Sequence, residues 1–406
     1  MQSLMYISII FGSAICWFVI LYAVFVTKPT AENEHLEVRI APVFKPNPII
    51  SEVNCSAYLN EESSEALAYT PIPLIDPPDL SMKCEDIHGR QTFVNETYPR
   101  EADFPIGFVR IVYKDYLFQE SELATNFNKN NTYCYVLDSS ASSKFQYQIR
   151  QLAKCFPQLI VPERTFDMKS NGSNVALAQL ECLKLMMDRQ WRYVMFLENY
   201  DIMIKTNQEL IKILELFGGV DDSGAFHDVP PQVATAFENS KNKVLAISQG
   251  TISRLTIDRI FHTMQFVKAL NSTVRELESE FLINVLTNNT LLDIDTYNGK
   301  KCIDRTSATK FVKWNYGQEC PSQRFHNHVC ILTLIDLLSL KSAYDFTAHK
   351  VEPSYDYGAI GCWHEYMFNK QHVIGNHYVN YTFYDHLPAL RWRRLQAIGR
   401  TTKFGC

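Results

Sequence analysis

The stretch "YVMFLENYDIMIKTNQELIKILELFGG", residues 193–219, contains a strand and a helix in succession. Its first five residues are apolar without alternation, which is typical of a strand covered on both faces. Thr206 and Glu209 then have the spacing of a capping box, and Gly218 follows the last apolar position of the helical pattern. The sequence therefore marks both ends of a helix that directly follows a buried strand.

The same alternation of strand and helix extends to both sides of this stretch. Short apolar runs predict further strands over residues 108–113, 133–137, 158–161 and 244–249. Amphipathic runs predict helices over residues 144–156, 174–189, 256–270 and 279–289. Strands separated by helices indicate an α/β fold with a mostly parallel sheet flanked by helices. One domain over residues 104–378 accounts for this pattern.

The segments outside this domain have different compositions. Residues 4–26 form 23 consecutive positions without a formal charge, long enough for a transmembrane helix after a tail of residues 1–3. A cleaved signal peptide is the alternative. Ten of the seventeen prolines lie between residues 27 and 105, which predicts a Pro-rich stem over residues 27–103. Residues 379–406 form a basic C-terminal extension.

Cysteines and glycosylation sequons indicate the compartment. Ten of the eleven cysteines follow the apolar segment, as expected for an oxidising environment. The segment is also followed by seven N-x-Ser/Thr sequons. Their asparagines are Asn54, Asn95, Asn130, Asn171, Asn271, Asn288 and Asn380. Both features predict that the chain after residue 26 lies in the lumen of the secretory pathway.

Charge and motifs exclude several functions. A formal net charge of -5 gives no reason to expect a nucleic-acid partner. The sequence contains no G-x-G-x-x-G, Walker, H-E-x-x-H or C-x-x-C motif, so nicotinamide, ATP and zinc chemistry lack their usual signatures. The short pattern "DID", residues 293–295, has the D-x-D form of cation-binding sites, but a solvated turn is the favoured interpretation.

A series of motifs, in order and spacing, resembles one family. The series begins with "FPIGFVRIVYKD" (104–115), "YCYVLD" (133–138), "KCFPQLIV" (154–161) and "WRYVMFLENYDIMIKTN" (191–207). It continues with "SEFLINVL" (279–286), "VKWNY" (312–316) and "HKVEPSYDYGAIGCWHE" (349–365). The chain is similar here to the core-2/I-branching β-1,6-N-acetylglucosaminyltransferases.

This resemblance implies a type II Golgi membrane enzyme with a GT-A fold. Such an enzyme transfers N-acetylglucosamine from UDP-GlcNAc to the 6-hydroxyl of a Gal or GalNAc residue on a glycan or glycoprotein acceptor. It implies no cofactor and no divalent metal, and a homodimer is a further expectation. The disulfides that the resemblance implies are Cys55–Cys362, Cys84–Cys155, Cys134–Cys182 and Cys320–Cys330.

The resemblance also implies roles for individual residues. Glu280 matches the catalytic carboxylate, which removes the proton of the attacking hydroxyl in a single inverting displacement. Lys350 matches the lysine that stabilises the leaving UDP. Trp314 and Tyr316 match residues that line the acceptor pocket. Asp138 ends a predicted strand, so it is a candidate for the nucleotide side.

The sequence departs from the family at a second cationic position. Asn327 stands where the family has an arginine, and an amide cannot neutralise a diphosphate. Arg324 or His328 are the candidate substitutes. Ser279 replaces the acidic residue that usually precedes the catalytic glutamate. Two alternatives therefore stay open: an enzyme related to the peptide O-xylosyltransferases, or a glycan-binding membrane glycoprotein that has lost its phosphate site.

Overall fold

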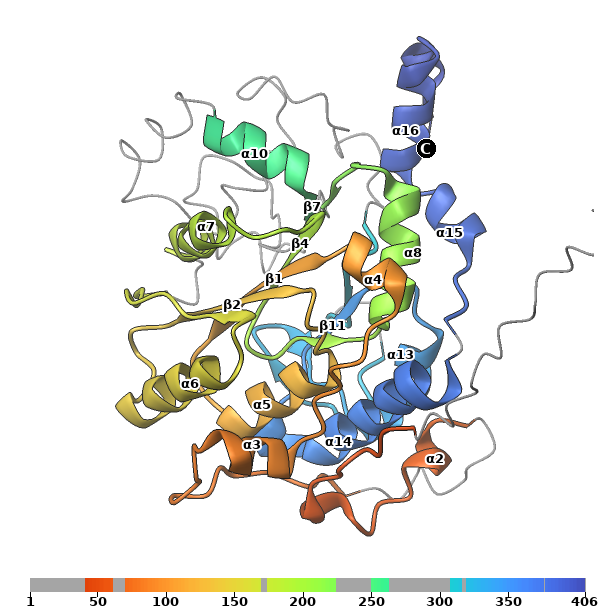
Figure 1. Cartoon of the computed structure of the whole chain (residues 1–406). Coiled ribbons are helices and arrows are strands. Elements are labelled where there is room, and N and C mark those ends of the chain that lie inside the picture. Colours follow the sequence, from red (N-terminus) through yellow and green to blue (C-terminus); the bar gives the residue numbers. More distant parts are fainter. Residues whose placement is uncertain are drawn as a thin grey trace, which may run out of the picture. The chain divides into compact units, whose positions relative to one another are not determined.

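The structure is a computed structural model (Figure 1), and all the residues it describes except Ala41 fall within Pro42–Cys406. The described ranges are 41–60, 70–168, 174–223, 250–262, 307–315, 319–375 and 377–405. No helix in these ranges is long and apolar enough to cross a membrane. The predicted anchor over residues 4–26 lies outside them.

Among the described residues, the main sheet has six strands, in the order β3-β2-β1-β4-β7-β6. The first four are parallel to one another, while β7 is antiparallel to both β4 and β6. The predicted α/β class with a mostly parallel sheet is therefore confirmed. The strands are β1 (Ile106–Val112), β2 (Thr132–Leu137), β3 (Leu159–Ile160), β4 (Tyr193–Leu197), β6 (Asp222–Ser223) and β7 (Gly250–Ser253).

Two hydrophobic cores lie on opposite faces of this sheet, because successive strand residues point to opposite sides. Phe108 of β1 belongs to the larger core, whereas the next residue, Val109, belongs to the smaller one. The larger core packs against α5 (Tyr116–Thr125), α6 (Ser143–Cys155), α8 (Asn207–Phe217) and α14 (Pro353–Asn369). The smaller core packs against α7 (Val175–Met186) and α10 (Arg254–His262). Figure 1 shows α6 and α7 on opposite sides of β1 and β2.

Helix α8 has the two ends that its sequence predicts. The Thr206 hydroxyl accepts a hydrogen bond from the Glu209 amide at 3.2 Å, and the Glu209 carboxylate accepts one from the Thr206 amide at 2.9 Å. Gly218 has a φ of 56°, the left-handed conformation that glycine adopts readily at a helix end. The predicted strand over 244–249 and helix over 279–289 lie outside the described residues.

Helix α5 was not predicted, since it is buried along its whole length and carries buried glutamates. Glu120 accepts hydrogen bonds from Arg90 at 3.0 and 2.7 Å. Glu122 contacts Arg110 at 3.1 Å and His364 at 2.8 Å. These partners come from β1, α14 and α3 (Cys84–Arg90). The charges of Glu120 and Glu122 are therefore compensated only when the chain is folded.

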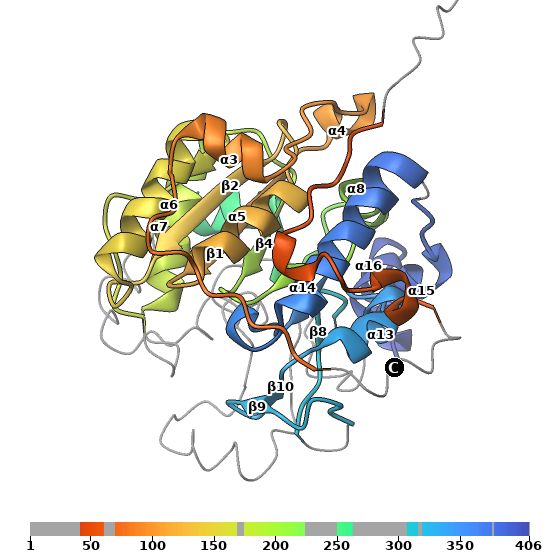
Figure 2. The ribbon, with the colours of Figure 1, turned by 90° about the horizontal axis from the view of Figure 1, so that it is seen from below.

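A second sheet of three strands, in the order β5-β11-β8, adjoins the first. Strand β11 (Thr347–His349) is antiparallel to β5 (Ile202–Met203) and parallel to β8 (Lys310–Val312). Strands β9 (Phe325–His326) and β10 (Val329–Cys330) form a separate hairpin, at the lower edge of Figure 2.

Four disulfides connect the described cysteines, in the pairs that the resemblance implies: Cys55–Cys362, Cys84–Cys155, Cys134–Cys182 and Cys320–Cys330. The first two join the predicted stem to the rest of Pro42–Cys406. The stem contains η1 (Pro48–Ile50), α2 (Cys55–Tyr58), α3 and α4 (Pro99–Asp103). The remaining elements are η4 (Leu334–Asp336), α13 (Leu337–Ser342), η5 (Lys370–Ile374), α15 (Tyr381–Asp385), α16 (Pro388–Ala397) and η6 (Thr401–Lys403).

Candidate active site

Polar side chains gather where the parallel strands end. Tyr113 follows β1, Asp138 follows β2 and Glu198 follows β4. Burial raises the pKa of the Tyr113 hydroxyl, and so does the negative charge of Glu198, Asp115, Glu352 and Asp138. These carboxylates therefore surround one tyrosine, as expected for the carboxyl edge of a parallel sheet.

Asp138 is buried at this edge, as its position at the end of β2 predicts. Its amide donates to the Val112 carbonyl at 3.1 Å, which aligns it with the end of β1. One carboxylate oxygen accepts a hydrogen bond from the Ser140 amide at 2.7 Å. Asp138 is thus held in a fixed position beside the ends of two strands.

Lys350 lies directly after β11 and is only 6% exposed. Its ammonium is 3.9 Å from Glu352 and 5.4 Å from the centre of the Tyr200 ring. Burial lowers the pKa of Lys350, although Glu352 and Glu198 oppose this shift. A cation that burial has stripped of water interacts more strongly with an incoming anion.

A buried carboxylate, Asp201, holds the end of β11, the strand that directly precedes Lys350. Asp201 bonds to His349 at 2.8 Å and forms an ion pair with Lys310. Burial favours its neutral form, but Lys310 and His349 together hold the pKa of Asp201 well below its usual range. These contacts join the ends of β8 and β11 to the loop after β4.

Lys114 is a further cation at this edge, and no sequence pattern identifies it. Its ammonium is 5.3 Å from the centre of the Tyr200 ring, the same ring that Lys350 contacts. The positive charge of Lys114 also lowers the pKa of Lys350, so the two ammonium groups interact. The Tyr200 hydroxyl donates to Asp115 at 2.7 Å, which orients the shared ring.

Asn327 occupies the turn of the β9–β10 hairpin. Asn327 and His328 have φ values of 50° and 65°, and a two-residue hairpin turn of type I′ requires positive φ at both positions. Asparagine adopts this conformation more readily than arginine does. Asn327 is exposed. The residue therefore suits the turn and supplies no charge.

The candidate substitutes for the missing arginine lie in different places. Arg324 is 4.0 Å from Glu352, the carboxylate that also contacts Lys350. Its guanidinium packs on the Tyr355 ring at 4.4 Å, and its side chain is 56% exposed. His328 bonds instead to Asn315 at 2.9 Å. The structure thus brings Arg324, rather than His328, into the charge cluster of Lys350.

Trp314 lies close to the same edge, after β8. Strand β8 pairs in parallel with β11, and Val312 stands opposite His349, so Trp314 and Lys350 follow neighbouring strand ends. Trp314 forms a bridge with Val329, next to the Cys320–Cys330 disulfide. The aromatic residue is therefore tied to the hairpin. Tyr316 and the predicted base, Glu280, lie outside the described residues and stay predictions.

The described sequons differ in accessibility. Asn54 and Asn95 are exposed, and Asn380 is half-buried. The side-chain nitrogen of Asn130 is buried, which is unfavourable for the attachment of a glycan. Asn171, Asn271 and Asn288 lie outside the described residues.

Within the described ranges, no group of three or more His, Cys, Asp and Glu side chains is placed to hold a metal ion. The metal-independent reaction stays a prediction. The described site offers a ligand one buried cation, Lys350, with the exposed cations Lys114 and Arg324, several carboxylates and the Tyr200 ring.

The chain is a parallel-dominated α/β protein with buried and exposed cations at the carboxyl edge of its sheet. Residues 106–239 match the family model "Branch: Core-2/I-Branching enzyme". Residues 106–239, about a third of the chain, thus match a Core-2/I-branching enzyme domain, in agreement with the family that the motifs predict.

Curated relatives agree with this assignment. The chain is 23% identical to "Beta-1,3-galactosyl-O-glycosyl-glycoprotein beta-1,6-N-acetylglucosaminyltransferase 3" of Rattus norvegicus, over 80% of this chain and 84% of the relative. It is 21% identical to a human β-1,3-galactosyl-O-glycosyl-glycoprotein β-1,6-N-acetylglucosaminyltransferase, over 83% of this chain and 90% of the relative. A shorter match, 29% identical, covers 34% of this chain and 35% of the human N-acetyllactosaminide β-1,6-N-acetylglucosaminyl-transferase.

Proposed function

We propose that this protein is an inverting glycosyltransferase that moves N-acetylglucosamine from UDP-GlcNAc to the 6-hydroxyl of a Gal or GalNAc residue, forming a β-1,6 branch. The family domain and the names of the relatives support this reaction. We further propose a GT-A fold, a type II Golgi membrane location and a luminal catalytic domain. The four disulfides are consistent with an oxidising lumen.

In the proposed reaction, the acceptor oxygen attacks the anomeric carbon and the bond from that carbon to the diphosphate oxygen breaks. Glu280 takes the proton of the attacking hydroxyl. The electron pair of the broken bond leaves with UDP, whose new charge needs fixed cations if no metal ion is present. Trp314 and Tyr316 are the proposed acceptor contacts, and Asp138 is proposed for the nucleotide side.

The observation that supports the proposal is a pair of lysines that both contact the Tyr200 ring. Lys350 and Lys114 lie 5.4 and 5.3 Å from the centre of the Tyr200 ring. Arg324 approaches the same cluster through Glu352. In this proposal, Lys114 and Arg324 supply the positive charge that the family places at the position of Asn327. The proposed diphosphate site therefore does not need a cation at position 327, in the turn itself.

A turnover assay on the purified full chain tests the function. UDP-GlcNAc and UDP-xylose are each offered with an O-glycan acceptor and with a Ser-Gly peptide. We expect transfer of N-acetylglucosamine to the glycan, and Lys350→Met should lower kcat on the order of a hundredfold, because one charge that stabilises the leaving group is lost. Lys114→Met should lower it less, since this lysine is exposed. Glu280→Gln should abolish most of the activity.

Lys154→Met is the matched control, because Lys154 is an exposed lysine of α6. Transfer of xylose to the peptide would instead support the relationship to the peptide O-xylosyltransferases. Absence of turnover with both donors, combined with sugar binding but no UDP binding in calorimetry, would support the glycan-binding glycoprotein.

A further inference from the structure

A pocket with a volume of about 180 Å³ lies at the first turn of α8. Its lining includes Lys205, which follows β5, and Glu209 of α8. The pairing of β5 with β11 places Lys205 near Asp345, before β11 begins, whereas Lys350 follows the last residue of β11. This pocket and the candidate active site are therefore at opposite ends of one strand.

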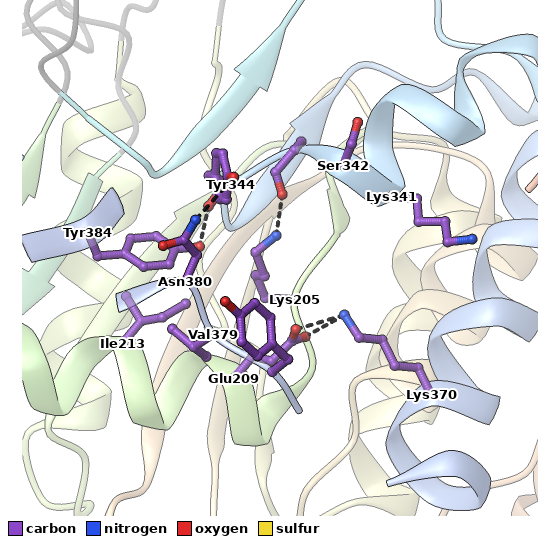
Figure 3. Close-up of a pocket in the computed structure, with 12 residues that line it drawn as sticks. Lys205, Glu209, Ile213, Lys341, Ser342, Tyr344, Lys370, Val379, Asn380 and Tyr384 are labelled. Carbon is purple, nitrogen blue, oxygen red and sulfur yellow. Dashed lines mark hydrogen bonds and ion pairs between the residues drawn. The ribbon is translucent and has the colours of Figure 1, made fainter. Parts of the chain in front are cut away.

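Two of the lysines that line this pocket have no uncompensated buried charge, because Lys370 has a carboxylate partner and Lys341 is exposed. Lys370 donates to both oxygens of Glu209, at 2.7 and 2.9 Å (Figure 3). Lys341 donates to the carbonyl of Leu59 at 2.9 Å. The charge of Lys370 is thus balanced by a carboxylate, and the ammonium of Lys341 is held by a neutral group.

Of the three lysines that line this pocket, Lys205 is the one whose partners compensate the cost of burying its charge the least. Its ammonium donates to the Ala343 carbonyl, the one acceptor that the described residues provide for its three N–H groups. Burial lowers the pKa of Lys205 to about 8, although Glu209 and Asp345 attract its charge. An anion beside this ammonium would offset its desolvation and use its remaining donors.

Tyrosine rings and an amide form the wall and rim of the pocket. Tyr378 is 75% exposed and Tyr344 is 41% exposed. The Tyr344 ring stacks on Phe383 with centroids 4.1 Å apart, and its hydroxyl accepts a hydrogen bond from Asn380 at 3.2 Å. A fixed aromatic face with polar groups nearby suits a ring that has one apolar side and several hydroxyls, which is the chemistry of a sugar.

We propose that this pocket is a second carbohydrate-binding site, separate from the active site, for a sugar that carries one carboxylate or sulfate group. The anionic group would bind the Lys205 ammonium, and the sugar ring would lie against Tyr344 and Tyr378. Such a site would hold an acidic glycan on the protein while a different part of the acceptor occupies the active site.

Asn380 adds a constraint on this binding. It lines the pocket and is the acceptor position of the sequon Asn380-Tyr381-Thr382. A glycan attached to Asn380 would stand at the rim of the pocket and compete for it. Thr382 is exposed and does not line the pocket, so Thr382→Ala removes the sequon without changing the lining.

Calorimetry on the purified full chain tests the proposal with three methyl glycosides. These are N-acetylneuraminic acid for the carboxylate, 6-sulfogalactose for the sulfate, and galactose as the neutral control. We expect at least one anionic sugar to bind, and at least tenfold more tightly than galactose. Lys205→Met should abolish this preference, and Tyr378→Ala should weaken binding severalfold with little risk to folding, because Tyr378 is largely exposed.

The controls separate this site from the proposed active site. Lys350→Met and saturating UDP should leave the affinity for the anionic sugar unchanged, and so should Lys154→Met. The proposal is overturned if neither acidic sugar binds to the wild-type chain or to Thr382→Ala. It is also overturned if Lys205→Met keeps the preference, or if UDP displaces the sugar.

Discussion

At the scale of single residues, the candidate active site depends on how burial changes the charge of Lys350. Burial lowers the pKa of this lysine, so its ammonium loses a proton at a lower pH than an exposed lysine does. Because only the charged form can stabilise a leaving diphosphate, the proposed activity should be lost as the pH rises through this lowered pKa.

This argument predicts a pH profile. The kcat/KM of the wild-type chain should fall on the alkaline side of the profile, at a pH below the usual lysine range. Lys350→Arg should move this fall to higher pH, because a guanidinium stays charged. Rates measured from pH 6 to 10 for both chains check the prediction. Identical alkaline limbs would show that Lys350 does not determine the fall.

Sequence reasoning predicts the position of two residues at this edge, and their roles stay predictions. Lys350 and Asp138 were predicted from motif and strand position, and both lie at the carboxyl edge of the sheets. Lys114 was missed, because its relation to Lys350 depends on a ring 86 residues further along the chain from Lys114. Asp201 was missed for a similar reason, since its partners Lys310 and His349 are 109 and 148 residues away. No local pattern carries such information.

At the scale of elements, local signals decided which helices could be predicted. Helix α8 has a capping box, an amphipathic pattern and a C-terminal glycine, so its ends were predicted to within one residue. Helices α5 and α14 were missed. Both are buried on most sides, and burial on all sides removes the periodicity that marks a surface helix. Their positions follow from tertiary contacts instead.

Gly361 of α14 provides a test of such a contact. A Cβ atom at this position would be 2.4 Å from the Cδ1 atom of Ile50 in η1, so Gly361→Ala forces the buried Ile50 side chain out of its present position. We expect the free energy of unfolding to fall by about 1 kcal/mol or more, despite the better helix propensity of alanine. Urea unfolding measures the change.

The matched control is Gly89→Ala in α3, where a Cβ atom would meet nothing within 4 Å. That change should leave stability unchanged or raise it by up to about 1 kcal/mol. If Gly361→Ala proved as stable as Gly89→Ala, the close packing of α14 on η1 would be refuted.

At the scale of the whole molecule, the disulfides join parts of the chain that are far apart in sequence. Cys55–Cys362 spans 307 residues, whereas Cys320–Cys330 spans 10. In the chain-entropy model a longer loop restricts the unfolded chain more. The first bridge is therefore expected to stabilise the fold, and the second mainly to fix the hairpin that carries Arg324.

We predict that the double change Cys55→Ser and Cys362→Ser lowers the free energy of unfolding by about 2 to 5 kcal/mol. It should also make residues 42–60 more sensitive to proteolysis. Cys320→Ser with Cys330→Ser should destabilise less but reduce turnover more. Chemical unfolding, limited proteolysis and the transfer assay distinguish the two pairs, and the reverse order of effects would contradict the prediction.

The attachment of residues 42–103 has a practical consequence for anyone who shortens this protein. A recombinant form that begins at residue 104, where the sequence predicts the domain to start, would lack Cys55, Cys84 and Arg90. Cys362 and Cys155 would then be free thiols, prone to mispairing during secretion. Glu120 would remain buried without its guanidinium. A secreted form that begins at Pro42 avoids all three defects.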